Sequence, residues 1–279
     1  MSYLAGDLRA FGAAIRKELR QIRRYPFLLA GLFFWPILLP SVYVLMGRVY
    51  SGNDPQAIAA FAERSGVTNV AGFVFVGFSM YMWLSTLLWG PGAQLRQEQI
   101  RGSLEAVFLT PASRLVLLFG PPLAHLSSTV LMFAVMGVAL RVFFGVELAP
   151  DAIARALVVI AVAIPAMYAI AALFAATVLK FGEVGPAVQF VRGILVLASG
   201  VSFPIVMLPG WAQAVAATLP PTYIVDDIRH VLLAGTGLGA VAGHLLLVLA
   251  MTGIIAALAV VVYRWIELQA RRTGMLSRY

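Results

Sequence analysis

The chain has 279 residues, of which 61% are hydrophobic and 11% are charged. A typical soluble domain has about 25% charged residues, so this composition excludes an ordinary soluble globular protein. The 20 Lys and Arg residues exceed the 12 Asp and Glu residues, and cysteine is absent. The lack of cysteine excludes a disulfide framework, a thiolate metal site and a cysteine nucleophile.

Six uncharged runs are each longer than the ~20 apolar residues that a helix needs to cross a membrane. They cover residues 25–47, 65–95, 115–140, 156–179, 193–225 and 231–263. Backbone amides in lipid must pair within their own segment, and these runs lack the period-two alternation of a membrane β-strand. The sequence therefore predicts an all-α membrane protein with six transmembrane helices.

A basic arm precedes the first run. Its apolar residues recur every three or four positions, at Leu4, Leu8, Phe11, Ile15, Leu19 and Ile22. This spacing predicts an amphipathic helix in the membrane interface, either as a simple anchor or with a functional role. We therefore divide the chain into an interface helix (1–26), a transmembrane domain (27–268) and a basic cytoplasmic tail (269–279).

Six spans place both termini on the same side of the membrane. Fifteen of the 20 Lys and Arg residues then lie on that side, including Lys180 and Arg192 in a loop between the fourth and fifth spans. Because Lys and Arg favour cytoplasmic loops, both termini are predicted to be cytoplasmic. Contact with anionic lipid of the inner leaflet accounts for the basic charge, and no nucleic-acid partner is needed.

The loop between the second and third spans, residues 94–114, is the densest polar stretch outside the termini. Glu98 and Arg101 lie on one face of a helix that continues from the second span. Gly102 permits a sharp turn, Ser103 can cap a new short helix, and Glu105 lies in its first turn. A short helix held below the membrane has the form of a docking element, and a solvated turn is the alternative.

The fifth run is longer than one span, and Pro209-Gly210 and Pro220-Pro221 divide it. The pieces 211–219 and 224–233 are each too short to cross a membrane. They predict a re-entrant or interfacial helical hairpin on the outer side, covering residues 209–234 between spans five and six. An ordinary loop with an apolar contact face is the alternative.

Ionisable residues follow the second pair of prolines, at Asp226, Asp227, Arg229 and His230. We expect them to cap and pair the ends of the hairpin helix, because carboxylates favour a helix N-terminus; a cation site is the alternative. Two further histidines, His125 and His244, fall within spans. Since no acidic residue lies in the runs, we interpret both as neutral, hydrogen-bonded histidines inside the bundle rather than as a proton relay.

Several motifs that identify other functions are missing. Neither lysine, Lys17 or Lys180, closes a Gly-x-x-x-x-Gly-Lys-Ser/Thr phosphate loop, so any ATPase is a separate polypeptide. The runs contain no Asp, Glu, Lys or Arg, which disfavours an ion-coupled membrane carrier. The absence of His-Glu-x-x-His and Gly-x-Ser-x-Gly disfavours a lipid-modifying membrane enzyme. These two functions stay as the alternatives.

The segment Glu98-x-x-Arg101-Gly102-Ser103-Leu104-Glu105, followed by Thr110-Pro111, resembles the loop between the second and third spans of ABC-2 type permeases. These proteins are the membrane subunits of ATP-binding-cassette exporters. The arm leading through Arg23-Arg24-Tyr25-Pro26 is similar to that family's arm. The series Phe203-Pro204, Leu208-Pro209, Pro220-Pro221-Thr222-Tyr223 and Asp226-x-x-Arg229 is also similar. The resemblance covers nearly the whole chain.

The resemblance implies a permease that dimerises with an identical or sister subunit and docks on a cytosolic ABC ATPase. Its coupling region would comprise Glu98, Arg101, Gly102, Ser103 and Glu105, assisted by Arg16, Lys17 and Glu18 of the arm. In the family the path runs between the two copies, lined mainly by spans two and five. This nominates Phe73, Phe78, Tyr81, Phe203 and Met207 as path residues, with ordinary helix packing as the alternative for each.

The resemblance also implies where the energy comes from and what is moved. The chain itself is expected to hold no catalytic residue, cofactor or metal, because ATP and magnesium would be bound by the partner ATPase. It lacks a large external domain between spans one and two, which is similar to the compact drug, lipid and glycan exporters. We expect an exporter of an amphipathic drug-, lipid- or glycan-type cargo in the plasma membrane of a bacterium or archaeon.

Overall fold

A computed structural model describes residues 26–51, 54–90, 126–181 and 183–273, together with the isolated positions 12, 16, 20, 24, 93, 96 and 100. Every regular element in these residues is a helix, which confirms the predicted all-α class. The α-helices are α2 (Pro26–Ser51), α3 (Pro55–Ser65), α4 (Val70–Trp89), α8 (Leu126–Phe144), α9 (Pro150–Phe181), α10 (Val184–Ala198), α11 (Gly210–Ala216), α12 (Pro220–Leu233) and α13 (Leu238–Thr273), and a short 3₁₀ helix, η1, covers Ile205–Met207.

Three helices are long and apolar enough to cross a membrane, at Val70–Trp89, Pro150–Val178 and Leu238–Ile266. Shorter apolar helices cover Phe33–Gly47, Ser128–Phe144 and Val184–Ala198. Each of these six segments overlaps one predicted run. The protein is thus a multi-pass helical membrane protein, and the count of six spans stays a prediction.

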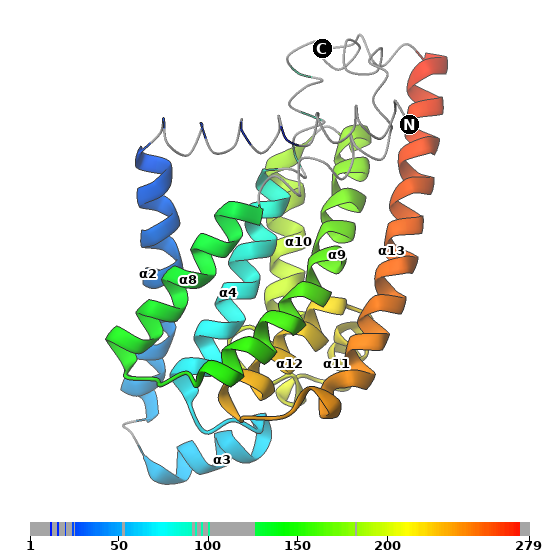
Figure 1. Cartoon of the computed structure of the whole chain (residues 1–279). Helices are drawn as coiled ribbons and strands as arrows, with labels where there is room; N and C mark the ends of the chain where they lie inside the picture. Colours follow the sequence, from blue (N-terminus) through cyan, green and yellow to red (C-terminus); the bar gives the residue numbers. More distant parts are fainter. Residues whose placement is uncertain are drawn as a thin grey trace.

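The long helices run side by side in one bundle (Figure 1). The N-terminal end of α2 and the C-terminal end of α13 lie at the same end of this bundle. The amphipathic helix α3 lies across the opposite end, near the start of α4 (Figure 1). Asp54 caps its N-terminus, because the Asp54 side chain accepts a hydrogen bond from the backbone N–H of Gln56, and Gly66, with a φ of 68°, caps its C-terminus. A left-handed residue of this kind commonly ends a helix, and glycine adopts it without strain.

The core lies between α4, α9, α12 and α13: α9 and α12 pack against each other, and each of them packs against both α4 and α13 (Figure 1). Trp83, Met167 and Ile224 are among its largest fully buried side chains. The outer face of α13 is instead apolar and exposed, for example at Leu246 and Ile254. An apolar face of this extent is unfavourable in water, and hydrocarbon is the solvent that suits it.

Two helices occupy the predicted hairpin region. The breaks fall at the predicted prolines, since α11 follows Pro209 and α12 begins at Pro220. Nine of the 14 residues of α12 are buried, and this helix packs against α4, α9 and α13. Its location inside the bundle distinguishes α12 from a surface loop.

Candidate functional site

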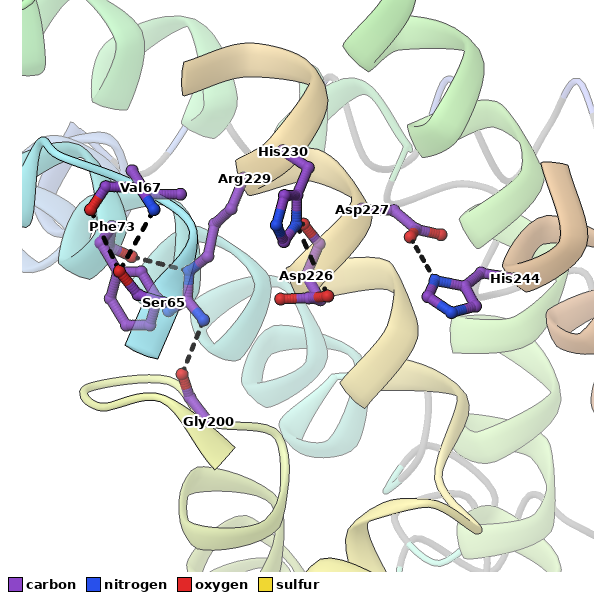
Figure 2. Close-up of polar contacts among 9 residues, drawn as sticks. All are labelled: Ser65, Val67, Phe73, Gly200, Asp226, Asp227, Arg229, His230 and His244. Carbon is purple, nitrogen blue, oxygen red and sulfur yellow. Dashed lines mark hydrogen bonds and ion pairs between the residues drawn. The ribbon is translucent and has the colours of Figure 1, made fainter. Parts of the chain in front are cut away.

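Four ionisable side chains of α12 point into or along the bundle: Asp226, Asp227, Arg229 and His230 (Figure 2). The two aspartates are the seventh and eighth residues of this helix, so the prediction that they cap its N-terminus is wrong. Pro220 and Pro221 occupy the start of the helix, where no side-chain cap is present. Proline has no backbone N–H, so these positions leave fewer donors for a carboxylate to satisfy.

Arg229 is held by backbone carbonyls of two other segments. It is only 2% exposed. Its Nε donates to the Phe73 oxygen over 3.0 Å, and its two terminal nitrogens donate to the oxygens of Gly200 and Val201 over 2.8 Å each. The guanidinium carbon also lies 3.3 Å from the centre of the Phe73 ring. Arg229 therefore ties α12 to α4 and to the turn after α10 (Figure 2).

Two glycines make this arrangement possible. Gly200 has a φ of 61°, in the left-handed region, and its carbonyl oxygen accepts a hydrogen bond from the guanidinium. Gly77 lies on α4 directly against this site, and a Cβ added there would overlap the Val201 oxygen and the Arg229 side chain. The helix can approach this closely only because the position lacks a side chain.

Burial lowers the pKa of the Arg229 guanidinium to about 9, while the charge of Asp226 acts in the opposite direction. Carbonyl oxygens, rather than a carboxylate, are its hydrogen-bond acceptors in the described residues. An unpaired buried cation is costly, so these three acceptors are what makes the burial tolerable.

Asp227 pairs with a histidine from the last long helix. Its Oδ1 lies 2.8 Å from Nδ1 of His244, and its other oxygen, Oδ2, is buried with no hydrogen-bond partner in the described chain. The side chain of Asp227 is 1% exposed, whereas that of His244 is 49% exposed and lies beside the Tyr223 ring. Burial raises the pKa of Asp227, and the hydrogen bond from His244 acts against this rise.

This pair corrects the interpretation of His244, which does have an acidic partner. The partner comes from α12, outside the uncharged runs, and lies 17 positions away in sequence. His244 is also half-exposed rather than enclosed in the bundle. His125 lies outside the described residues.

His230 connects α12 to the end of α3. Its Nδ1 lies 2.9 Å from the backbone oxygen of Asp226 and 3.5 Å from the Asp226 carboxylate. A Cβ added to Gly66 would come within 2.7 Å of the His230 Nε2, so the α3 end packs directly on this ring. The next turn is shaped by Ser65, whose hydroxyl bonds both the N–H and the carbonyl of Val67 (Figure 2).

The five nominated path residues fall into two groups. Phe73 and Phe78 are buried on α4, where Phe73 packs on Phe61 and Arg229. Phe203 and Met207 lie after α10, and both are at least partly exposed. The structure thus places Phe73 next to Arg229. The sequence analysis named both residues but did not predict this contact. The role of these residues as a path lining stays a prediction.

Tyr81, the fifth nominee, contacts Arg192. Arg192 donates from Nη2 to the Tyr81 hydroxyl, and its guanidinium carbon lies 5.1 Å from the centre of the Tyr81 ring. The prediction that Arg192 lies in a loop is wrong, because it is the ninth of the 15 residues of α10. The sequence analysis required each span to be uncharged. It therefore began this span at residue 193 and left Arg192 outside.

Most of the predicted ATPase-coupling residues lie outside the described residues. This applies to Glu98, Arg101, Gly102, Ser103, Glu105, Lys17 and Glu18. Arg16 is described: it is helical and exposed, and its Nε donates to the Gly12 oxygen. The coupling assignment stays a prediction.

Comparison with known families identifies the family of the chain. The model of the ABC-2 type transporter family matches residues 9–233, which is well over half of the chain. No curated protein matches significantly. The match includes α12 with its buried arginine and the loop 94–114. The chain therefore belongs to the ABC-2 type transporter family, as a membrane permease component that works with an ABC ATPase.

Proposed function

We propose that the protein is the permease of an ATP-driven exporter in the plasma membrane of a bacterium or archaeon. A separate cytosolic ABC ATPase docks on the loop 94–114 and on the arm around Arg16, and its ATP cycle shifts the bundle between inward- and outward-accessible states. The observation that carries this proposal is the family match, which runs through this loop in a chain that has no phosphate-binding loop of its own.

In this arrangement both termini are cytoplasmic and six helices cross the membrane. The bias of Lys and Arg toward the terminal side supports this orientation. Helices α3, α11 and α12 then belong to the outer half, with α11 and α12 as the re-entrant hairpin. Two permease copies, identical or related, enclose the path, and lipid solvates the exposed apolar face of α13.

The cargo is amphipathic, of a drug, lipid or glycan type. Aromatic side chains follow one another from α2 to α4, with the Tyr43 and Phe78 rings 4.8 Å apart and the Phe78 and Tyr81 rings 5.9 Å apart. Tyr43 is exposed at the bundle surface. Rings of this kind offer an apolar wall that tolerates several tail or ring structures.

Charge reversal in the loop tests the coupling assignment. The variants Glu98→Lys and Glu105→Lys are co-expressed with the ABC ATPase, and Glu63→Lys, on the exposed surface of α3, is the matched control. We expect both loop variants to lower co-purification of the ATPase or to uncouple ATP hydrolysis from transport in proteoliposomes, and the control to do neither. Wild-type behaviour of both loop variants contradicts the docking site, and cargo movement by the permease alone contradicts an ATP-driven mechanism.

A further inference from the structure

Arg192 is a charged residue within an apolar helix. It lies eight residues after Val184, which is about 12 Å along an α-helix. Its partner Tyr81 lies eight residues before Trp89, again about 12 Å from the corresponding helix end. These ends face the terminal side of the bundle, so both side chains start well inside the apolar layer on that side. Ionisable residues at such positions are costly and usually functional.

The guanidinium of Arg192 is only partly used by the protein. In addition to the Tyr81 hydroxyl, it donates to the Gln189 side-chain oxygen over 3.3 Å. An arginine has five N–H donors, and no carboxylate in the described residues forms an ion pair with this one. Nε of Arg192 is buried without a hydrogen-bond partner in the same residues.

Arg229 shows what a structural arginine looks like in this protein. Three backbone oxygens satisfy it at 2.8 to 3.0 Å, and it is closed off from the surface. Arg192 is instead half-buried, and its hydrogen-bond partners in the described residues are the neutral side chains of Gln189 and Tyr81. Its charge is therefore not neutralised by the part of the chain that the structure describes.

We propose that Arg192, oriented by Tyr81, binds the anionic headgroup of the cargo, a phosphate or a carboxylate on an amphipathic molecule. This proposal rests on the proposed export function and narrows its cargo class. A guanidinium presents parallel donors that match both kinds of oxyanion, and it binds them more strongly away from water. The exposed Tyr43 ring and the half-buried Tyr81 ring, which both pack against the buried Phe78, lie alongside to receive the apolar part.

The depth of the site indicates how the headgroup arrives. With the termini cytoplasmic, Arg192 and Tyr81 lie in the inner half of the bilayer. A headgroup of the inner leaflet reaches them by moving a short way inward along the face between α4 and α10. The aqueous phase supplies the same oxyanion chemistry as free phosphate, so the experiment must separate the two sources.

Three probes with the same tail measure the headgroup preference: dodecyl phosphate, dodecyltrimethylammonium and dodecanol. Their binding to the permease–ATPase complex in phosphatidylcholine nanodiscs is followed by competition with a fluorescent alkyl phosphate. We expect Arg192→Gln to lower the binding affinity for dodecyl phosphate by about tenfold to a hundredfold and to leave the affinities for the other two probes unchanged. Arg192→Lys keeps the charge but loses the parallel donors, so it should restore only part of the affinity, and Tyr81→Phe should cause a smaller loss than Arg192→Gln. Arg141→Gln, at an exposed position on α8, is the matched control.

An equal loss of affinity for all three probes shows a packing role for Arg192 and overturns the proposal. Unchanged affinity for all three probes overturns it as well. Displacement of the alkyl phosphate by inorganic phosphate at equal concentration shows that the tail does not contribute, which overturns the assignment to an amphiphile.

Transport in proteoliposomes separates cargo from resident lipid. ATP-driven movement of a fluorescent alkyl phosphate, with a preference over its cationic analogue that falls at least about tenfold in Arg192→Gln, supports the proposal. Binding of the anionic probe without its transport, while the cationic probe is transported, identifies a lipid site and overturns it. If no amphiphile moves with ATP, the proposed function itself fails, whereas movement with an unchanged headgroup preference refutes only the role of Arg192.

Discussion

Replacing Arg229 by methionine tests whether its hydrogen bonds to three backbone carbonyls stabilise the fold. The substitution keeps an unbranched side chain but removes all three hydrogen bonds to Phe73, Gly200 and Val201. The Phe73 oxygen lies within helix α4 and keeps its intrahelical bond. The oxygens of Gly200 and Val201 lie in the turn after α10, where Arg229 is their hydrogen-bond donor, so the substitution leaves both buried and unpaired.

The expected loss follows from these two oxygens. Each unsatisfied buried carbonyl costs about 1–3 kcal/mol, so Arg229→Met should lower the free energy of unfolding by about 2–6 kcal/mol. Lysine has one nitrogen, which cannot reach three acceptors arranged around a planar fork, so Arg229→Lys should recover only part of the loss.

The assay is unfolding of the detergent-solubilised permease by titration with dodecyl sulfate, followed by tryptophan fluorescence. The matched control Arg141→Met removes an exposed arginine from α8 and should change the stability by less than about 0.5 kcal/mol. A loss of less than about 1 kcal/mol for Arg229→Met would refute the reasoning, because it would mean that the freed carbonyls find water or other donors.

Two further substitutions probe the same region. Gly77→Ala should give little folded protein in fluorescence-detected gel filtration, because its Cβ would overlap the Val201 oxygen, whereas Gly137→Ala has open space around it and should fold normally; equal yields would argue against the close approach. Burial raises the pKa of Asp227 above its unfolded value, so folding favours the protonated carboxyl and this contribution to stability is lost as the pH rises through the raised pKa. Asp227→Asn should therefore flatten the decline in melting temperature as the pH rises above about 4, the ordinary pKa of an aspartate. A curve parallel to that of the wild type would show that the pair with His244 offsets the cost of burial.

The helical architecture follows from the sequence because lipid leaves few choices. Uncharged runs identified the apolar helices, and Pro209-Gly210 and Pro220-Pro221 identified the divisions before α11 and α12. These signals are local: hydropathy decides which segments are buried or in lipid, and proline decides where a helix begins.

The polar contacts were beyond the reach of the same reasoning because they join distant segments. Asp227 meets His244 across two helices, and Arg229 meets backbone oxygens whose positions depend on the positive φ of Gly200. Backbone acceptors leave no trace in residue type. Arg192 was misplaced for a different reason, since a rule that ends a span at any charge cannot detect a cation that a tyrosine stabilises inside it.

The links made by α12 have a mechanical consequence. Arg229 fastens this helix to α4, Asp227 fastens it to α13, and His230 lies under the end of α3. A helix held by contacts with three neighbouring helices does not move independently of them. In the proposed transport cycle, α12 is therefore expected to move together with these neighbours as one unit.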